Sequence, residues 1–220
     1  MKNLLFYSFI LLFCFLETNA QIINNNDSSQ ANKFVISTDK TRVFYKGLQN
    51  PLSISNCGGD INIIVEGAGA NFRKIGTGQY IVTCTQTGVT IVTMSDGTKT
   101  EQLKIPVKRV PDPIAIVGGS AGGNMTLANF RSQDRVVAEL RDFIFEGVKF
   151  NVLSYIIIAM GKGFEEPDFA EVNGSAFSGG ATALITKCQA GTTVTIAEIK
   201  VSEPGGGTRK LDQTITFILQ

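Results

Sequence analysis

The stretch from Gln79 to Val107 reads QYIVTCTQTGVTIVTMSDGTKTEQLKIPV and predicts the fold of the first half of the chain. Tyr80, Val82 and Cys84 share one face of a strand predicted at Gln79–Thr85, and Gly88 separates this strand from a second one at Val89–Met94. Asp96-Gly97 follows, and this pair tolerates the positive φ angles of a tight hairpin turn. Thr100–Val107 is the expected return strand. The segment therefore indicates antiparallel β structure.

Shorter strands are predicted before this hairpin, and glycine, asparagine and proline residues separate them. They are expected at Phe34–Ser37, Val43–Tyr45, Leu52–Ser55 and Ile61–Val65. About seven short strands within about 75 residues, with frequent turn signals, favour an immunoglobulin-like sandwich. We expect this first domain to span residues 33–110.

Val110-Pro111-Asp112-Pro113 is the predicted domain boundary, because the two prolines restrict their neighbours to extended geometry and make a stiff connector. Residues 111–220 are expected to form a second β-rich domain. Tyr155–Met160 is its densest apolar run and is interpreted as a buried strand. One short helix is predicted at Phe177–Lys187, and a short helix or turn at Ser132–Leu140. Phe143–Phe145 and Val148–Met160 are expected to form a long strand or a hairpin, and the other strands of this domain are expected at Ile114–Val117, Thr192–Val201 and Leu211–Leu219. The predicted fold class is all-β, with two immunoglobulin-like β-sandwich domains, the second of which has one or two short helices.

The N-terminus has the layout of a secretory signal peptide. Lys2 precedes the apolar run Leu4–Leu16, and Ala20 marks the predicted cleavage site. That run is shorter than the about 20 residues that a membrane-spanning helix needs. We therefore expect residues 1–20 to be removed, residues 21–32 to form a flexible leader, and the protein to be exported without stable membrane insertion.

The composition argues against several functions. The chain has 20 Lys and Arg and 19 Asp and Glu, with a net charge of +1 and scattered positive residues, so nucleic acid is not an expected partner. Histidine is absent, although most nucleophilic triads and catalytic zinc sites use it. The chain is therefore not expected to be an enzyme, and no catalytic residue, metal site or cofactor is predicted.

Three cysteines remain if the signal peptide is removed: Cys57, Cys84 and Cys188. An odd number in an exported protein leaves at least one thiol unpaired or shared between chains. One hypothesis is a disulfide between Cys57 and Cys84. The alternative is three separate half-buried thiols.

Two other stretches resemble ligand-binding sites, but we favour a structural interpretation of each. Gly118–Gly123 follows a strand but lacks the lysine and hydroxyl residue of a phosphate-binding loop. Four acidic residues near Pro167 do not have calcium-loop spacing, and we interpret them as part of a solvated loop. They are Glu165, Glu166, Asp168 and Glu171.

Three motifs carry a resemblance to a known family. Tyr45, Gly47, Asn50 and Pro51 form a Y-x-G-x-x-N-P turn, Lys108–Pro113 reads KRVPDP, and Ser202–Leu219 reads SEPGGGTRKLDQTITFIL. In this order and spacing they resemble the C-terminal periplasmic part of GldM, which is called PorM in non-gliding relatives. That family belongs to the gliding-motility and type IX secretion apparatus, and the resemblance covers roughly Phe34 to Gln220.

The resemblance implies a two-domain periplasmic β module taken from a dimeric shaft that joins an inner-membrane motor to a ring below the outer membrane. We expect this chain to lack the motor-coupling part. The resemblance also places Arg209, Lys210 and Asp212 in the family's turn-and-strand motif, where they are a candidate partner surface. Expected partners are envelope proteins, such as components of the secretion ring, and a second copy of the chain.

The leading hypothesis is therefore an exported, non-enzymatic protein–protein interaction module, with the periplasm as its expected location. The alternative is a secreted or surface adhesin-like binding module. A third hypothesis, a hydrolase that uses the acidic residues between Glu165 and Glu171, is the least favoured.

Overall fold

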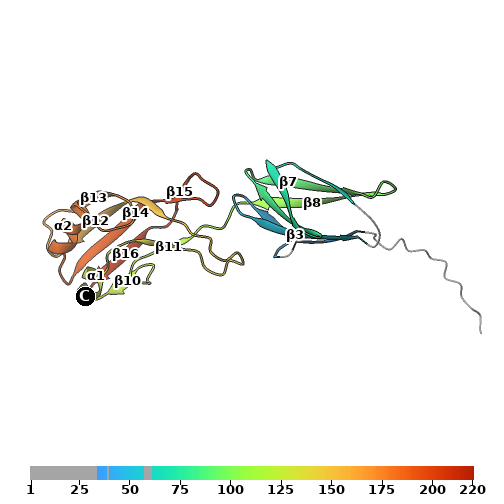
Figure 1. Cartoon of the computed structure of the whole chain (residues 1–220). Coiled ribbons are helices and arrows are strands. Elements are labelled where there is room, and N and C mark those ends of the chain that lie inside the picture. The colour runs from blue at the N-terminus through green and yellow to red at the C-terminus, as the bar shows by residue number, and fades with distance from the viewer. Residues whose placement is uncertain (1–33, 39, 57–60) are drawn as a thin grey trace, which may run out of the picture. The chain divides into compact units, whose positions relative to one another are not determined.

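The first half of the chain folds as two facing four-stranded sheets in a computed structural model that describes residues 34–38, 40–56 and 61–220 (Figure 1). The first sheet has the order β1-β3-β6-β5, and these strands span Phe34–Thr38, Asn50–Asn56, Gln79–Cys84 and Ala70–Gly76. The second sheet has the order β2-β8-β7-β4, and its strands span Phe44–Tyr45, Thr100–Lys108, Gly88–Ser95 and Asn62–Glu66. The predicted hairpin is the β7–β8 pair, with Ser95 opposite Thr100.

Alternation along these strands produces the core between the two sheets. Leu52, Ile54 and Val82 of the first sheet and Val92 and Ile105 of the second are buried in one cluster. Strand β5 was not predicted, because glycines at 67, 69, 76 and 78 make that stretch resemble a loop.

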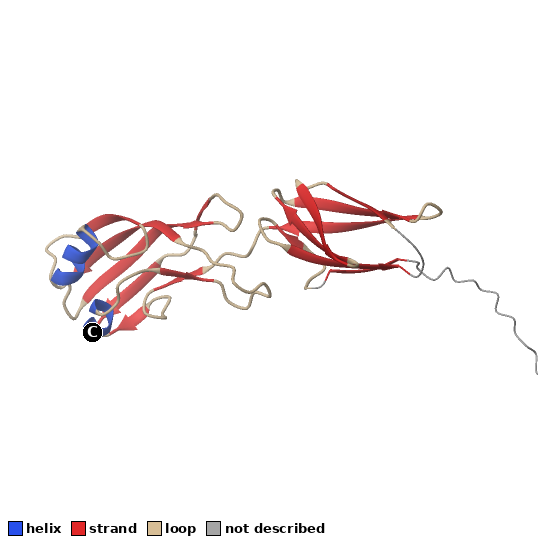
Figure 2. Cartoon of the chain, in the orientation of Figure 1, coloured by secondary structure: helices blue, strands red, loops and turns tan. Residues whose placement is uncertain are grey.

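The second half of the chain is built on a larger sheet with the order β10-β16-β14-β12-β13. These strands span Gly123–Met125, Ile215–Leu219, Thr192–Ser202, Val152–Gly161 and Asp168–Asn173, and β15, Thr208–Lys210, pairs with the end of β14. A two-stranded sheet of β9, Ile114–Ile116, and β11, Val137–Glu139, accompanies it. The fold is all-β with immunoglobulin-like sandwiches, as predicted (Figure 2).

Two short helices complete this half, as predicted, but one lies elsewhere than expected. The helix α2, Gly180–Lys187, falls within the predicted Phe177–Lys187. The helix α1 spans Leu127–Arg131, because Thr126 accepts a hydrogen bond from the Asn129 amide and caps it. The expected helix or turn at Ser132–Leu140 is wrong in part, since β11 occupies 137–139.

Two further expectations are corrected. Asp168 and Glu171, which we assigned to a solvated loop, lie in strand β13 and pair with Ala159 and Ile156 of β12. Phe143–Phe145, which we expected to be extended, is not a strand. Asp142 before it has a φ of 52°, which interrupts extended backbone.

The buried cluster of this half lies on one face of the large sheet. Tyr155, Ile157, Val194, Ile196 and Phe217 point from the sheet into it, and α1, α2 and β9 supply the opposing residues Phe130, Leu184 and Ala115. The signal peptide, the leader and Cys57 lie outside the described residues. Within the described ranges, neither helix has the length and apolar character that crossing a bilayer requires.

Candidate functional site

The three motifs singled out in the sequence meet at one place in the structure. Asn50 organises the first of them. Its side chain is buried, and its Oδ1 accepts a hydrogen bond from the Tyr45 amide at 2.7 Å. Its Nδ2 lies 3.0 to 3.1 Å from the carbonyl oxygens of Tyr45, Leu48 and Val82. One side chain therefore holds the turn between β2 and β3 and ties it to β6.

The turn that Asn50 holds presents Gly47 to the third motif. Gly47 has a φ of 78°, a conformation that L residues rarely adopt, and a Cβ built on it would lie 2.2 Å from the Pro204 carbonyl oxygen. The same Cβ would lie 2.7 Å from the Gly205 Cα. Backbone packs directly against backbone here, so this position requires glycine.

An ion-pair network surrounds this close approach and includes the second motif. Arg209 is 7% exposed, and its Nε donates to Glu203 Oε1 at 2.8 Å while its Nη1 donates to the Val110 carbonyl at 2.9 Å. Nη1 also donates to Asp112 Oδ1. One guanidinium thus links the loop after β14 to the proline-containing connector.

Glu203 accepts from both sides of the network. Arg109 Nη2 donates to its Oε1, and Lys46 Nζ lies 3.6 Å from its Oε2. Burial by itself would raise the pKa of Glu203, but the hydrogen bonds and charges of Arg209 and Arg109 outweigh it and lower the pKa to about 2. Glu203 is therefore ionised at any physiological pH.

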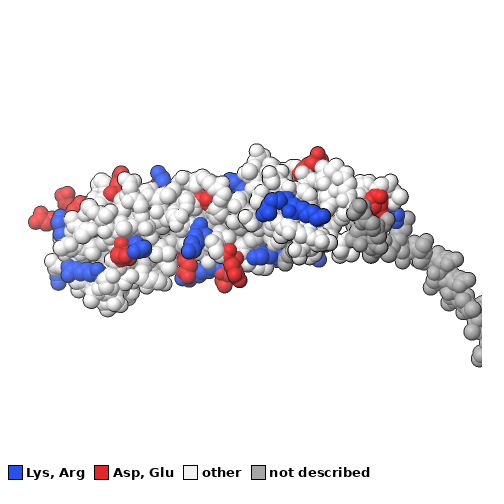
Figure 3. Space-filling view, in the orientation of Figure 1, with Lys and Arg blue, Asp and Glu red and all other residues white. Residues whose placement is uncertain are grey.

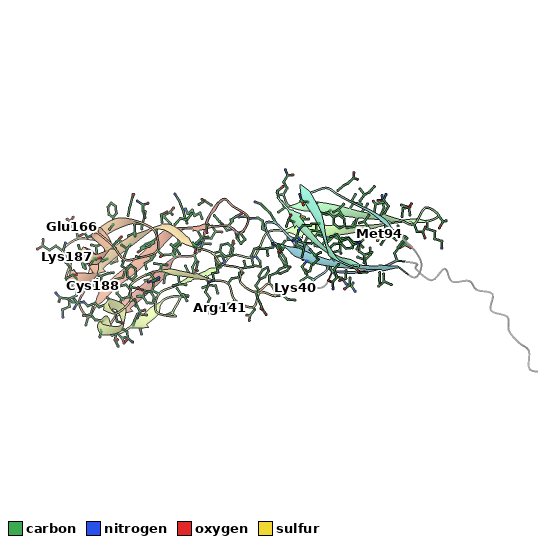
Figure 4. All side chains as sticks on the ribbon, in the orientation of Figure 1. Lys40, Met94, Arg141, Glu166, Lys187 and Cys188 are labelled. Carbon is green, nitrogen blue, oxygen red and sulfur yellow. The ribbon has the colours of Figure 1, made fainter. Side chains whose placement is uncertain are left out.

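Aromatic residues pack against the first motif from the loop 141–147. The Tyr45 ring meets Phe143 and Phe145 edge-to-face, with ring centroids 4.9 and 5.5 Å apart. The Lys40 ammonium lies 4.8 Å from the centre of the Phe145 ring (Figure 4). Tyr45 and Leu48 also pack against the buried cluster of the second half.

We call the whole arrangement the joint. It comprises Lys46, Gly47, Arg109, Val110, Asp112, Glu203–Gly205 and Arg209, with the aromatic contacts of Tyr45.

The structure changes the interpretation of the candidate partner surface. Arg209 is the buried middle residue of β15, and its Cζ lies 5.3 Å from the centre of the Phe150 ring. Its side chain belongs to the joint and does not form an exposed surface. Lys210 and Asp212 are exposed, and Lys210 pairs with Glu198 at 2.6 Å. Their role in partner binding stays a prediction.

The cysteines lie apart from the joint. Cys84 and Cys188 are buried free thiols, and the Cys84 Sγ lies 3.5 Å from the Thr90 hydroxyl. Burial raises the pKa of both thiols, against which Thr90 lowers that of Cys84. The predicted Cys57–Cys84 disulfide involves Cys57, which lies outside the described residues, so the pairing stays a prediction.

The acidic residues do not converge. Glu165 and Glu166 are exposed in the turn before β13, and Figure 4 shows Glu166 at one end of this half. Asp168 and Glu171 are an odd number of residues apart on β13, so they point to opposite faces of the sheet. Asp168 pairs with Lys187 at 3.5 Å. Among the described residues, no group of three potential ligands is placed to hold a metal ion.

The glycine-rich loop closes on itself. Val117 and Ser120 exchange backbone hydrogen bonds of 2.9 and 3.0 Å across Gly118-Gly119, and strand β10 follows, not a helix. A hollow of about 520 Å³ lies on the first half, and Lys74 is the one charged residue among the described residues that line it.

Comparison with known proteins gives two family matches. Residues 33–108 match the GldM third domain, and residues 111–220 match the GldM C-terminal domain. No curated protein matches the chain significantly.

Similar solved structures include the Yersinia pseudotuberculosis adhesin InvE, with 11% identity, a TM-score of 0.26 and coverage of 84% of this chain and 58% of that chain. Domains 5-6 of the S-layer protein SbsC align with 16% identity, a TM-score of 0.26 and coverage of 83% and 98%. The four N-terminal immunoglobulin domains of Dscam1 isoform 7.44 align with 9% identity, a TM-score of 0.27 and coverage of 85% and 51%. The chain thus spans little more than half the length of two of these structures.

Proposed function

Because the chain belongs to the GldM family, whose members are periplasmic components of gliding motility and type IX secretion, we propose that it is an exported, non-enzymatic protein–protein interaction module of that apparatus. Its two sandwiches would act together, as a stiff pair, and would bind an envelope partner through their surfaces. The observation that carries the proposal is the joint.

The joint supports a mechanical role because its parts have no evident chemical one. Arg209 and Glu203 neutralise each other in a buried site, and Arg209 Nη1 also donates to the Val110 carbonyl and to Asp112. Enzymes that close over a substrate need a hinge, and hinges lie in segments that absorb changes in φ and ψ. Here the connector contains Pro111 and Pro113, and the carbonyl of Val110 just before them accepts a hydrogen bond from Arg209. Such a segment resists bending.

The surface is consistent with binding a protein and not a polyanion. Figure 3 shows Lys and Arg interspersed with Asp and Glu, with no field of one sign on the face it presents. The charges of the chain nearly cancel. Contacts would then depend on shape and apolar area more than on electrostatic steering.

The test is crosslinking in the intact cell envelope, followed by identification of the captured proteins. A photoreactive residue at exposed Asp212 or Lys210 is expected to capture a component of the secretion or gliding apparatus. The same residue at Lys99, in the exposed β7–β8 turn of the first half, is the position control. Capture of no such component from any position would refute the proposal. Protease accessibility in intact cells, which indicates surface display, would favour the adhesin-like alternative.

A further inference from the structure

Strand β13 is the last strand at one border of the large sheet (Figure 1). Within the described residues, β12 is the one strand that pairs with it, in an unbroken antiparallel register from Asp168 to Asn173. The helix α2 packs on the face of β13 that carries Ala170, since a Cβ added at Gly180 would lie 2.8 Å from the Ala170 Cβ. No described strand therefore pairs with the side of the β13 backbone that points away from β12.

Two hydrogen bonds determine which backbone groups lie on that side. The Gly174 amide donates to the Leu153 carbonyl at 2.7 Å, and this pair continues the β12–β13 register by one position. Hydrogen-bonded and non-hydrogen-bonded pairs alternate in an antiparallel ladder, so Phe169, Glu171 and Asn173 direct their N–H and C=O groups away from β12. The Phe169 amide agrees with this, since it donates to the carboxylate of the preceding residue at 2.9 Å. We call the outward backbone groups of these three residues the open edge.

The open edge has little of the protection that sheet borders usually carry. Natural edge strands are blunted by lysine, proline, β-bulges or short length. Strand β13 reads DFAEVN, with no proline, lysine or glycine, and its register has no shift. By contrast, the edge strand β5 contains Arg73 and Lys74 and has a register shift before Gly76. At the opposite border of the large sheet, β10 is three residues long and begins with Gly123. Of these three edge strands, β13 is the best suited to accept a further strand.

The side chains beside the open edge indicate what kind of strand it would accept. Phe169 is 65% exposed, and Glu171, two positions further on the same face, is also exposed. Asp168 pairs with Lys187 at 3.5 Å, whereas Glu171 has no ion pair within the described part of the chain. Neighbouring side chains on adjacent strands interact directly, so a cation beside Glu171 and an apolar group beside Phe169 would stabilise the pairing.

The apolar surface beside the open edge continues onto β12. Ile156 lies opposite Glu171, and Ile158 lies opposite Phe169. Both isoleucines are half-buried, so the run Tyr155–Met160, which we predicted to be a buried strand, is fully covered on one face only. A large apolar side chain on an added strand would extend this surface and shield the Phe169 ring from water.

We propose that the open edge binds an extended peptide segment of a partner protein by β-strand addition. The segment has Lys or Arg opposite Glu171 and a large apolar residue two positions away, opposite Phe169. Backbone hydrogen bonds supply affinity for any extended chain, and these two side chains supply the preference. The inference rests on the proposed function and deepens it, because it names the class of segment that the partner presents.

The experiment measures binding of the labelled peptide Thr-Val-Thr-Lys-Thr-Phe-Thr to the protein, purified as the cell processes it. When the peptide runs antiparallel to β13, its lysine lies opposite Glu171, its phenylalanine opposite Phe169 and its valine opposite Asn173. Fluorescence anisotropy should detect binding at protein concentrations up to about 1 mM. A peptide with glutamate in place of its lysine should bind at least threefold more weakly, because like charges then face each other. Glu171→Gln should remove this preference, and Glu66→Gln, at an exposed residue of the edge strand β4, is the matched control that should keep it.

Methylation of single peptide nitrogens tests the backbone pairing separately. The N–H of the peptide's lysine points towards β13, whereas the N–H of the threonine that follows it points away. Methylation of the lysine nitrogen should weaken binding at least tenfold, and methylation of the threonine nitrogen should change it less than twofold. Glu171→Pro removes an outward N–H and no bond to β12, so it should abolish binding while circular dichroism shows that the fold is kept.

Several outcomes would overturn the proposal. They are no binding at about 1 mM protein, equal effects of the two methyl groups, and binding that Glu171→Pro leaves intact. Self-association of the chain that Glu171→Pro abolishes, without any peptide binding, would also overturn it, because a second copy would then occupy the edge. The peptide assay does not depend on the crosslinks expected from Lys210 and Asp212, so this inference and the proposed function can fail separately.

Discussion

Glu203→Gln is the substitution that tests the joint most directly, because it removes one charge and changes the shape of the side chain little. Glu203 is 8% exposed and accepts hydrogen bonds from Arg209 and Arg109. A folded-state pKa of about 2, against an ordinary value of 4.5, corresponds to about 3 kcal/mol of stability at neutral pH. Loss of one partner from a buried ion pair costs about 3 to 5 kcal/mol, which agrees with this magnitude.

The sign of the pH dependence follows from the direction of the shift. Because folding lowers the pKa of Glu203, the stabilisation is complete above the unfolded-state pKa of about 4.5 and is lost as the pH falls towards about 2. The free energy of unfolding should therefore drop by about 3 kcal/mol more in the unchanged chain than in Glu203→Gln between pH 5 and pH 2. At pH 7 the variant should be about 3 kcal/mol less stable.

Urea unfolding at pH 7, 5, 3 and 2 measures both quantities, with unfolding of the second half followed separately from the first. Glu165→Gln is the matched control, since Glu165 is exposed and has no ion pair among the described contacts. A difference between Glu203→Gln and the unchanged chain that stays the same from pH 7 to pH 3 would refute the reasoning, and so would a loss below about 1 kcal/mol at pH 7.

Three further predictions concern the joint and the cores. Gly47→Ala should lower the free energy of unfolding clearly more than Gly97→Ala and should expose the connector to proteolysis. Both glycines have φ near 80° to 90°, but of these two only the Cβ at position 47 would meet backbone. Equal losses in the two variants would contradict the close approach. Asn50→Ala should lower the free energy of unfolding by about 2 to 4 kcal/mol, measured by heat or urea, because the Tyr45 amide and the Val82 carbonyl lose their hydrogen-bond partner. Asn71→Ala, at an exposed strand position, should lower it little. Cys84 and Cys188 should resist alkylation at pH 8 in the folded chain and react rapidly in urea, since burial raises the pKa of both thiols; rapid labelling of both in the folded state would show that they are accessible.

Alternation and turn residues in the sequence predicted most of the strands. More and less exposed positions alternate along β6 and β8, along β7 from Thr90 on and along β14 up to Ala197, and this period of two made these strands predictable. β5 was missed because glycines surround it, and β13 because its acidic residues occupy exposed positions. The helix α1 begins at Leu127 and not at the predicted Ser132, because the Thr126 cap sets where this five-residue helix begins.

The joint could be predicted only in part. The three motifs were recognised, but nothing in their spacing shows that Gly47 touches Pro204 or that Arg209 reaches Val110, at separations of 157 and 99 residues along the chain. Arg209 was taken for a surface residue because arginines beside a glycine turn usually are exposed. Its burial depends on Glu203, Asp112 and Phe150 all being present around it.

The sequence alone determined that this chain is an all-β protein with the third and C-terminal domains of its family, because strand alternation and turn residues act over a few positions and motifs keep their order. Tertiary structure alone decided which charges are buried, which thiols are shielded and which strand edge is left open. Those properties depend on long-range contacts that bring distant segments together, and only the folded chain shows what covers a given side chain.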